Sequence, residues 1–160
     1  MPAGRPPHKE PGTQSSPEAR LEMVREAVRA DPRFEVSTLE LERPGPSYTV
    51  DTLRELRASE PDSEIYLIMG VDQYEDLQTW HRPEELLGMA RLAVMDRGGK
   101  SARAASPHVA GAEDAVFVPV RRVDVSSTAI RADVREGRDA SASLPAGVAA
   151  IIEREGLYSA

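Results

Sequence analysis

The spacing of apolar residues changes repeatedly along this chain and predicts helices that alternate with short strands. Helical spacing covers residues 21–28, 50–56, 86–89, 130–134 and 148–152, and a further helix is predicted over 73–79. Continuous apolar runs at 65–69, 92–95 and 116–118 are typical of buried parallel strands. Partial alternation from Phe34 to Leu41 predicts one more strand.

Turn-forming residues separate these elements. Residues 1–16 are rich in Pro, Gly, Ser and Thr, whereas residues 100–114 have no period and are expected to form a mobile surface loop. Ser47 or Thr49 is a candidate cap for the helix over 50–56. Gly156 ends the final helix, with Leu157 as its capping contact. The whole pattern predicts one α/β domain over residues 1–160 with a mostly parallel sheet.

Composition narrows the class of protein. Of the 160 residues, 29% are charged and 40% hydrophobic, as in globular domains. No apolar run is long enough to cross a bilayer or form a signal-peptide core, so we expect no membrane partner and a cytoplasmic location. The absence of cysteine excludes disulfides and thiolate metal sites, and the three separated histidines predict no metal site. A net charge of −7 argues against a nucleic-acid partner.

The segment Val125–Arg131 has the composition of an anion-binding helix start. Ser126, Ser127 and Thr128 stand where a helix should begin, and there unpaired N–H groups and the macrodipole favour an anion. Arg131 follows one turn later with a guanidinium fork that suits phosphate oxygens. The structural alternative is a well-capped helix with a surface arginine.

Gly70 and Asp72 stand at the carboxyl end of the predicted strand 65–69, where open α/β sheets bind ligands. The glycine would let a nucleotide approach the backbone, and the carboxylate would accept hydrogen bonds from the ribose or the adenine side. A tight turn with an aspartate cap explains the same residues equally well.

Trp80 and the pair His8–Lys9 are further candidates. Trp80, before Pro83, offers a flat face to an aromatic ring and an added attraction to a cationic one, although tryptophans usually pack into cores. His8 and Lys9 offer an imidazole and an ammonium for a phosphate, and a solvated tail is their alternative. The sequence contains no nucleophilic triad, Walker loop or glycine-rich dinucleotide motif, which disfavours covalent catalysis and the usual NAD-binding fold.

These motifs, in this order, resemble those of the bacterial nicotinate-nucleotide adenylyltransferases. The matching segments are Pro6–Lys9, Arg20–Met23, Arg43–Leu53, Met69–Asp72 with Trp80, and Val125–Arg131. The last is similar to the family's phosphate motif I-S-S-T-x-I-R. The resemblance covers nearly the whole chain and implies a Rossmann-like nucleotidyltransferase fold with helices on both faces of the sheet.

One family motif has no counterpart in this sequence. The family begins with a strand and a G-x-F-D-P-x-H-x-G-H loop, whose histidines are expected to bind ATP phosphates and stabilise the transition state. The resemblance therefore implies that the chain starts inside the second strand's exit loop and lacks the first strand, about one βα unit of roughly 30 residues. No catalytic residue is assigned for this reason.

The resemblance implies transfer of AMP from ATP to nicotinate mononucleotide, giving deamido-NAD and pyrophosphate in NAD biosynthesis. The mononucleotide phosphate would attack the α-phosphorus in line, with Mg²⁺ on the pyrophosphate side. The implied nicotinate contacts are Thr49, Trp80 and His81. The implied ATP and phosphate contacts are His8, Lys9, Gly70, Asp72, Ser126, Ser127, Thr128 and Arg131. The two nucleotides are the expected partners, and a homo-oligomer is left open.

Three alternatives remain. A related adenylyltransferase would act on nicotinamide mononucleotide or phosphopantetheine, although the segments around Thr49 and Trp80 favour nicotinate. A catalytically impaired nucleotide-binding remnant would follow from the lacking histidine motif, and it would fold poorly without a central strand. A plain structural α/β domain leaves the ordered motifs unexplained.

Overall fold

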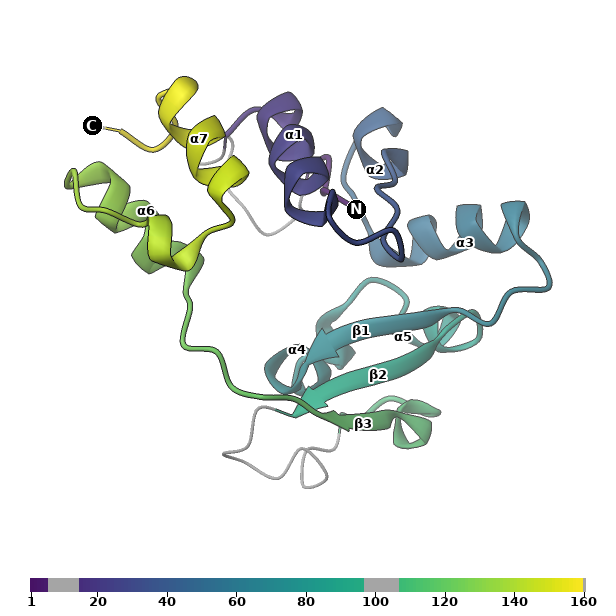
Figure 1. Ribbon diagram of the computed structural model, residues 1–160. Helices are drawn as coiled ribbons and strands as arrows, with labels where there is room; N and C mark the ends of the chain where they lie inside the picture. Colours follow the sequence, from purple (N-terminus) through teal and green to yellow (C-terminus); the bar gives the residue numbers. More distant parts are fainter. Residues whose placement is uncertain (6–14, 97–106, 160) are drawn as a thin grey trace. The chain divides into compact units, whose positions relative to one another are not determined.

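The computed structural model describes residues 1–5, 15–96 and 107–159, and the chain divides into two compact units (Figure 1). Unit 1 comprises Met1–Ser47 with Asp124–Ala160, and unit 2 comprises Tyr48–Val123. His8 and Lys9 lie outside the described residues, as does the first part of the predicted loop 100–114. The expectation of one domain over residues 1–160 stays a prediction.

Unit 2 contains a three-stranded parallel sheet in the order β1-β2-β3 (Figure 1). The strands are β1 (Tyr66–Gly70), β2 (Arg91–Asp96) and β3 (Val116–Pro119). Leu67 lies opposite Leu92, and Val94 lies opposite Phe117. The three strands predicted from continuous apolar runs are therefore confirmed.

Helices fill the connections of unit 2. They are α3 (Thr49–Ser59), α4 (Val71–Glu75), the 3-10 turn η1 (Leu77–Thr79), α5 (Pro83–Leu87) and the 3-10 turn η3 (Ala112–Asp114). The helix predicted over 73–79 is present as α4 followed by η1, and it starts two residues early, directly after β1. A parallel pair needs such a crossover, because the chain must return to the same end of the sheet.

The cap predicted for α3 is wrong. Tyr48 is the N-cap residue and supplies no side-chain cap bond. The Ser47 hydroxyl instead accepts hydrogen bonds from the backbone N–H groups of Gly4 and Arg5, each at 3.1 Å. The hydroxyl therefore ties the first residues of the chain to unit 1, a partner that local sequence does not reveal.

The core of unit 2 forms from one face of the sheet together with α3, α4, η1, α5 and η3. Leu77, Leu86 and Val94 are fully buried. The Tyr74 hydroxyl donates to the Ala112 carbonyl at 2.9 Å, and burial, reinforced by the nearby Glu113 carboxylate, raises the pKa of Tyr74. The burial of Ala112 also corrects the prediction that residues 100–114 form a surface loop throughout.

The outer face of the sheet is exposed, contrary to the prediction of fully buried strands. On β1, Met69 is buried, whereas Tyr66 is 44% and Ile68 66% exposed. Val116 and Val118 on β3 are exposed as well. Successive side chains of a strand point to opposite faces, so a continuous apolar run does not reveal whether both faces are covered.

Unit 1 is helical in its described part. Its elements are α1 (Pro17–Val28), α2 (Leu39–Glu42), α6 (Ser127–Arg135), the 3-10 turn η4 (Ser141–Ser143) and α7 (Ala146–Arg154). α1 packs against α7, and a Cβ on Gly147 of α7 would lie 2.0 Å from a carboxylate oxygen of Glu26 on α1. A larger residue at this position would therefore require the flexible Glu26 side chain to move.

Local capping fixes the start of α1 and the end of α7. The Ser16 hydroxyl accepts from the Ala19 N–H at 3.1 Å, and so caps α1. Gly156, with φ +58°, ends α7, and the Leu157 N–H donates to the Ile152 carbonyl at 3.0 Å. The predicted end of the final helix is confirmed.

The strand predicted from Phe34 to Leu41 is wrong. Residues 39–42 form the short helix α2, and Phe34 is exposed. The Thr38 carbonyl accepts from the N–H groups of Leu41 and Glu42, and its hydroxyl donates to the Glu42 carboxylate at 2.6 Å. Alternation predicts a strand only where another strand pairs with it, whereas these turn bonds form locally.

Leu86→Ala tests the core of unit 2. Because the leucine is fully buried, we expect the free energy of unfolding to fall by about 2–5 kcal/mol in urea titrations. Ile68→Ala is the matched control on the exposed face and should cost less than about 1 kcal/mol. Equal losses in the two variants would contradict this assignment of the core.

Candidate functional site

The carboxyl end of β1 presents Gly70 and Asp72 at the start of α4. Gly70 has φ −81°, and a Cβ built on it meets no heavy atom of the described chain within 4 Å. Neither backbone conformation nor packing therefore requires glycine here, and the space above it is open. Asp72 is exposed and lies inside α4, whose N-cap is Gly70, so the alternative of an aspartate cap is wrong.

The two segments that resemble a nicotinate site meet in unit 2. Thr49 is the first residue of α3. The centroid of the Tyr48 ring, directly before it, lies 4.4 Å from the centroid of the His81 ring, and the two ring planes are inclined at 32°. Trp80 is half-buried and packs against the core, while His81 is exposed. Tyr48 is not among the site residues predicted from the sequence, and its position beside Thr49 was the available signal.

An ionic network joins α3 to the segment that carries Trp80. Arg54 on α3 donates to Glu85 on α5 at 2.6 Å and also pairs with Asp51. Arg82 lies 3.4 Å from Glu85 and has φ +53°, in the left-handed region that favours glycine. The Arg54 hydrogen bond lowers the pKa of Glu85, and the ion pairs help to hold the backbone after His81.

The predicted phosphate segment forms the start of α6 in unit 1. The Ser126 hydroxyl accepts from the Ala129 N–H at 3.4 Å, and the helix begins at Ser127. Ser127 and Thr128 are exposed, and Arg131 is half-buried one turn further on. The predicted helix start is confirmed, with its hydroxyl and arginine side chains on the first two turns.

Arg20 on α1 holds both flanks of the segment that contains His8 and Lys9. Its guanidinium donates to the carbonyls of Ala3, Gly4 and Ser15, the last two at 3.3 Å. Those carbonyls precede and follow residues 6–14. Arg20, the first residue of the matching segment Arg20–Met23, therefore has a structural role in the described residues.

The predicted site residues are divided between the two units. Gly70 and Asp72 lie in unit 2 with Thr49, Trp80 and His81. Ser126, Ser127, Thr128 and Arg131 lie in unit 1. In the parts of the chain that the structure describes, no three His, Cys, Asp or Glu side chains form a metal-binding group. None of the described helices has the length and apolarity needed to cross a membrane.

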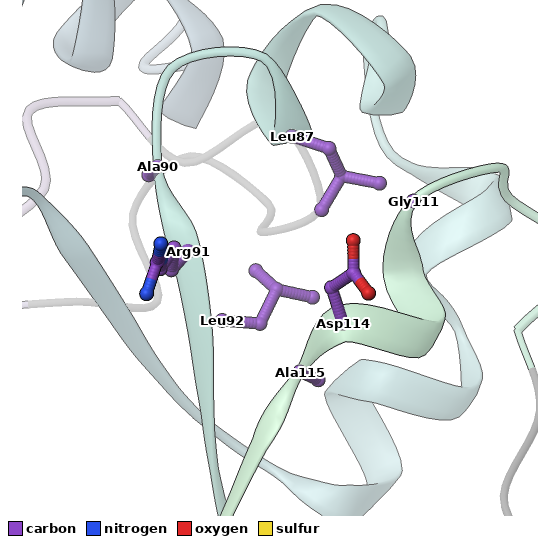
Figure 2. A pocket seen from close by; sticks show the side chains of 7 residues that line it. All are labelled: Leu87, Ala90, Arg91, Leu92, Gly111, Asp114 and Ala115. Atoms are coloured by element: carbon purple, nitrogen blue, oxygen red, sulfur yellow. The ribbon is translucent and has the colours of Figure 1, made fainter.

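A cavity of about 460 Å³ lies at the other end of the sheet. Its lining residues are Leu87, Ala90, Arg91, Leu92, Gly111, Asp114 and Ala115 (Figure 2). Figure 2 shows Leu87 and Leu92 on opposite sides, with the Asp114 carboxylate pointing between them. This cavity is at the amino ends of β2 and β3, whereas open α/β sheets bind ligands at the carboxyl ends, so it is not assigned to the nucleotides.

Comparison with known proteins identifies the family. The cytidylyltransferase-like family matches residues 1–133. A probable nicotinate-nucleotide adenylyltransferase of Thermus thermophilus is 47% identical over 156 residues, covering 98% of this chain and 80% of the relative. The chain belongs to the nicotinate-nucleotide adenylyltransferase family. The Geobacillus thermodenitrificans member is 41% identical over 155 residues, covering 97% of this chain and 68% of its own.

Solved structures confirm the fold of this adenylyltransferase family member. The Plasmodium falciparum nicotinic acid mononucleotide adenylyltransferase complexed with APC has a TM-score of 0.67 at 16% identity, covering 90% of this chain and 76% of the other. Its complex with NaAD has a TM-score of 0.68, with coverages of 94% and 78%. The predicted Rossmann-like nucleotidyltransferase fold with parallel strands is therefore confirmed.

Glu85→Gln tests the network between α3 and α5 through pH. The folded-state pKa of Glu85 is lowered, so its contribution to stability is present above the usual value of 4.5 and is lost as pH falls below it. The thermal midpoint of wild type should exceed that of the variant at pH 7, and the gap should narrow progressively as the pH is lowered from about 4.5 to about 3.

Glu84→Gln is the control, since Glu84 is an exposed residue on the same turn of α5. It should leave the midpoint near that of wild type at both pH values. A gap for Glu85→Gln that persists unchanged at pH 3 would contradict the role given to the ion pair.

Proposed function

We propose that this protein transfers AMP from ATP to nicotinate mononucleotide, producing deamido-NAD and pyrophosphate in NAD biosynthesis. The observation that carries the proposal is the contact between the rings of Tyr48 and His81, the neighbours of Thr49 and Trp80 in sequence, in a chain that belongs to the nicotinate-nucleotide adenylyltransferase family. Thr49 comes from one segment and the adjacent pair Trp80–His81 from another, and a pyridine ring with a carboxylate needs both aromatic and polar neighbours.

The start of α3 suits the carboxylate of nicotinate. Tyr48 supplies no side-chain cap there, and an uncapped helix start attracts an anion through its N–H groups and macrodipole. The Thr49 hydroxyl adds a donor. Trp80, held by its packing against the core, offers a ring face to the pyridine, and the His81 ring lies beside Tyr48. Nicotinamide lacks the charge that this helix start favours.

ATP takes the remaining predicted residues in this proposal. The open space over Gly70 admits the adenosine, and Asp72 accepts hydrogen bonds from its ribose or adenine side. Ser126, Ser127, Thr128 and Arg131 hold phosphates, and His8 and Lys9 contribute their positive or hydrogen-bonding groups to the same anions.

The reaction needs no protein nucleophile. A phosphate oxygen of the mononucleotide attacks the α-phosphorus of ATP in line, the bond from that phosphorus to the pyrophosphate oxygen breaks, and pyrophosphate leaves with the electron pair. The chain's own groups orient the two nucleotides and neutralise charge. Mg²⁺ enters as part of the ATP substrate and supplies further charge neutralisation on the pyrophosphate side.

A substrate panel tests the proposed activity. The purified chain is given MgATP with nicotinate mononucleotide, nicotinamide mononucleotide or phosphopantetheine, and pyrophosphate and the adenylylated product are measured. We expect deamido-NAD to form with the highest kcat/KM. Adenylylation of phosphopantetheine but not of nicotinate mononucleotide would sink the proposal, and so would the absence of product from all three.

Gly70→Val separates ligand binding from folding. Open space around the glycine and its ordinary φ predict an unchanged thermal midpoint, because a Cβ at this position meets no described atom within 4 Å. The same side chain would occupy the space proposed for the nucleotide, so KM for ATP should rise at least about ten-fold, or about 1.4 kcal/mol of binding. Gly137→Val is a control in a left-handed position, where the cost falls on stability instead.

A further inference from the structure

Tyr158 has an unusual backbone for a large residue. Its φ is +65°, in the left-handed region, and among the described residues it shares a positive φ with one other non-glycine, Arg82. A side chain with a Cβ is disfavoured there, so the surrounding contacts must hold it. The chain path into Tyr158 is set by the end of α7, where Gly156 reverses the backbone and Leu157 bonds back to Ile152.

The Tyr158 ring lies against Arg131 of the phosphate segment. The guanidinium carbon is 6.0 Å from the ring centroid, within the range of a cation–π contact. In the described residues, no carboxylate forms an ion pair with Arg131, whereas Arg54, Arg138 and Arg154 all have acidic partners. A ring face attracts the cation without occupying its in-plane N–H groups, so these donors stay available to an anion.

The Tyr158 hydroxyl reaches a third segment. It lies 3.0 Å from the Ser15 hydroxyl, directly before the N-cap of α1. The Ser15 carbonyl in turn accepts from Arg20 at 3.3 Å. One tyrosine therefore connects the end of the chain, the α6 arginine and the start of α1, all within unit 1.

We propose that Tyr158 is a positioning residue for Arg131. Its ring holds the guanidinium on the α6 surface with its donors directed to an anion, and its hydroxyl fixes the ring through Ser15. The identity of that anion as an ATP phosphate rests on the proposed function; the geometry of the pair does not. Tyr158 is not among the residues predicted from the sequence, since its partners are distant along the chain.

Two substitutions separate the ring from the hydroxyl. Tyr158→Phe keeps the ring but removes the hydroxyl contact with Ser15, so the upfield ring-current shift of the Arg131 side-chain protons in NMR spectra should persist in reduced form. Tyr158→Leu should abolish that shift and weaken ATP binding about three- to five-fold in calorimetric titration, the equivalent of a modest cation–π contact. Tyr66→Leu, at an exposed tyrosine of unit 2, is the matched control and should change neither quantity.

A double-mutant cycle with Arg131→Gln distinguishes positioning from general support of the fold. If Tyr158 acts through Arg131, Tyr158→Leu should cause no further loss of ATP affinity once the arginine is gone. An equal loss in both backgrounds, or no ring-current shift in the wild-type protein, would overturn the inference. Failure of the substrate panel with an intact ring-current shift would reject the proposed reaction and leave the Tyr158–Arg131 contact established.

Discussion

Parallel pairing of β1, β2 and β3 is the constraint on which unit 2 depends. Each parallel step obliges the chain to cross from one end of the sheet to the other. In the described residues, helices and a 3-10 turn occupy the crossover from β1 to β2, and the 3-10 turn η3 leads into β3. The first crossover carries α4, η1 and α5, and with them Gly70 and Trp80. The residues proposed to bind nucleotides therefore occupy their places as a consequence of strand direction, while their chemistry depends on side-chain type.

Two kinds of contact hold these residues against α3. The Tyr48 and His81 rings adjoin, and Arg54 pairs with Glu85 on α5. Both link the beginning of α3 to the segment after η1. The exposed ion pair contributes modestly to stability, because solvent screens it. For a binding site, the ion pair limits the positions that the backbone between His81 and α5 can take.

In unit 1, the positive charge of Arg131 has a different kind of partner. Most arginines of the chain with described partners bind carboxylates or carbonyls, and Arg131 has an aromatic ring instead. A cation held by a ring keeps its donors for an anion, and the start of α6, where the Ser126 hydroxyl caps one N–H group, adds the positive end of the helix macrodipole. This arrangement agrees with a reaction in which both substrates are negatively charged and catalysis consists of positioning and neutralisation.

Local pattern in the sequence was sufficient for most of the helices, for the three strands of the sheet and for the ordered motifs of the family. Apolar period, caps and turn residues act over a few positions, so α3, α6, α7 and the three strands follow from neighbouring residues alone. The same locality explains the resemblance in the segments around Gly70 and Arg131. A motif of adjacent residues is visible without any knowledge of the fold.

Tertiary structure decided everything that depends on a distant partner. The segment at Phe34 looked like a strand but had no strand to pair with, and the Ser47 hydroxyl bonded to the start of the chain instead of capping α3. Ile68 lies in an apolar run yet is exposed, because the face of a strand is set by the layers around it. The partners of Tyr158 are Ser15 and Arg131, and no local period connects residues so far apart, so only the folded chain could reveal them.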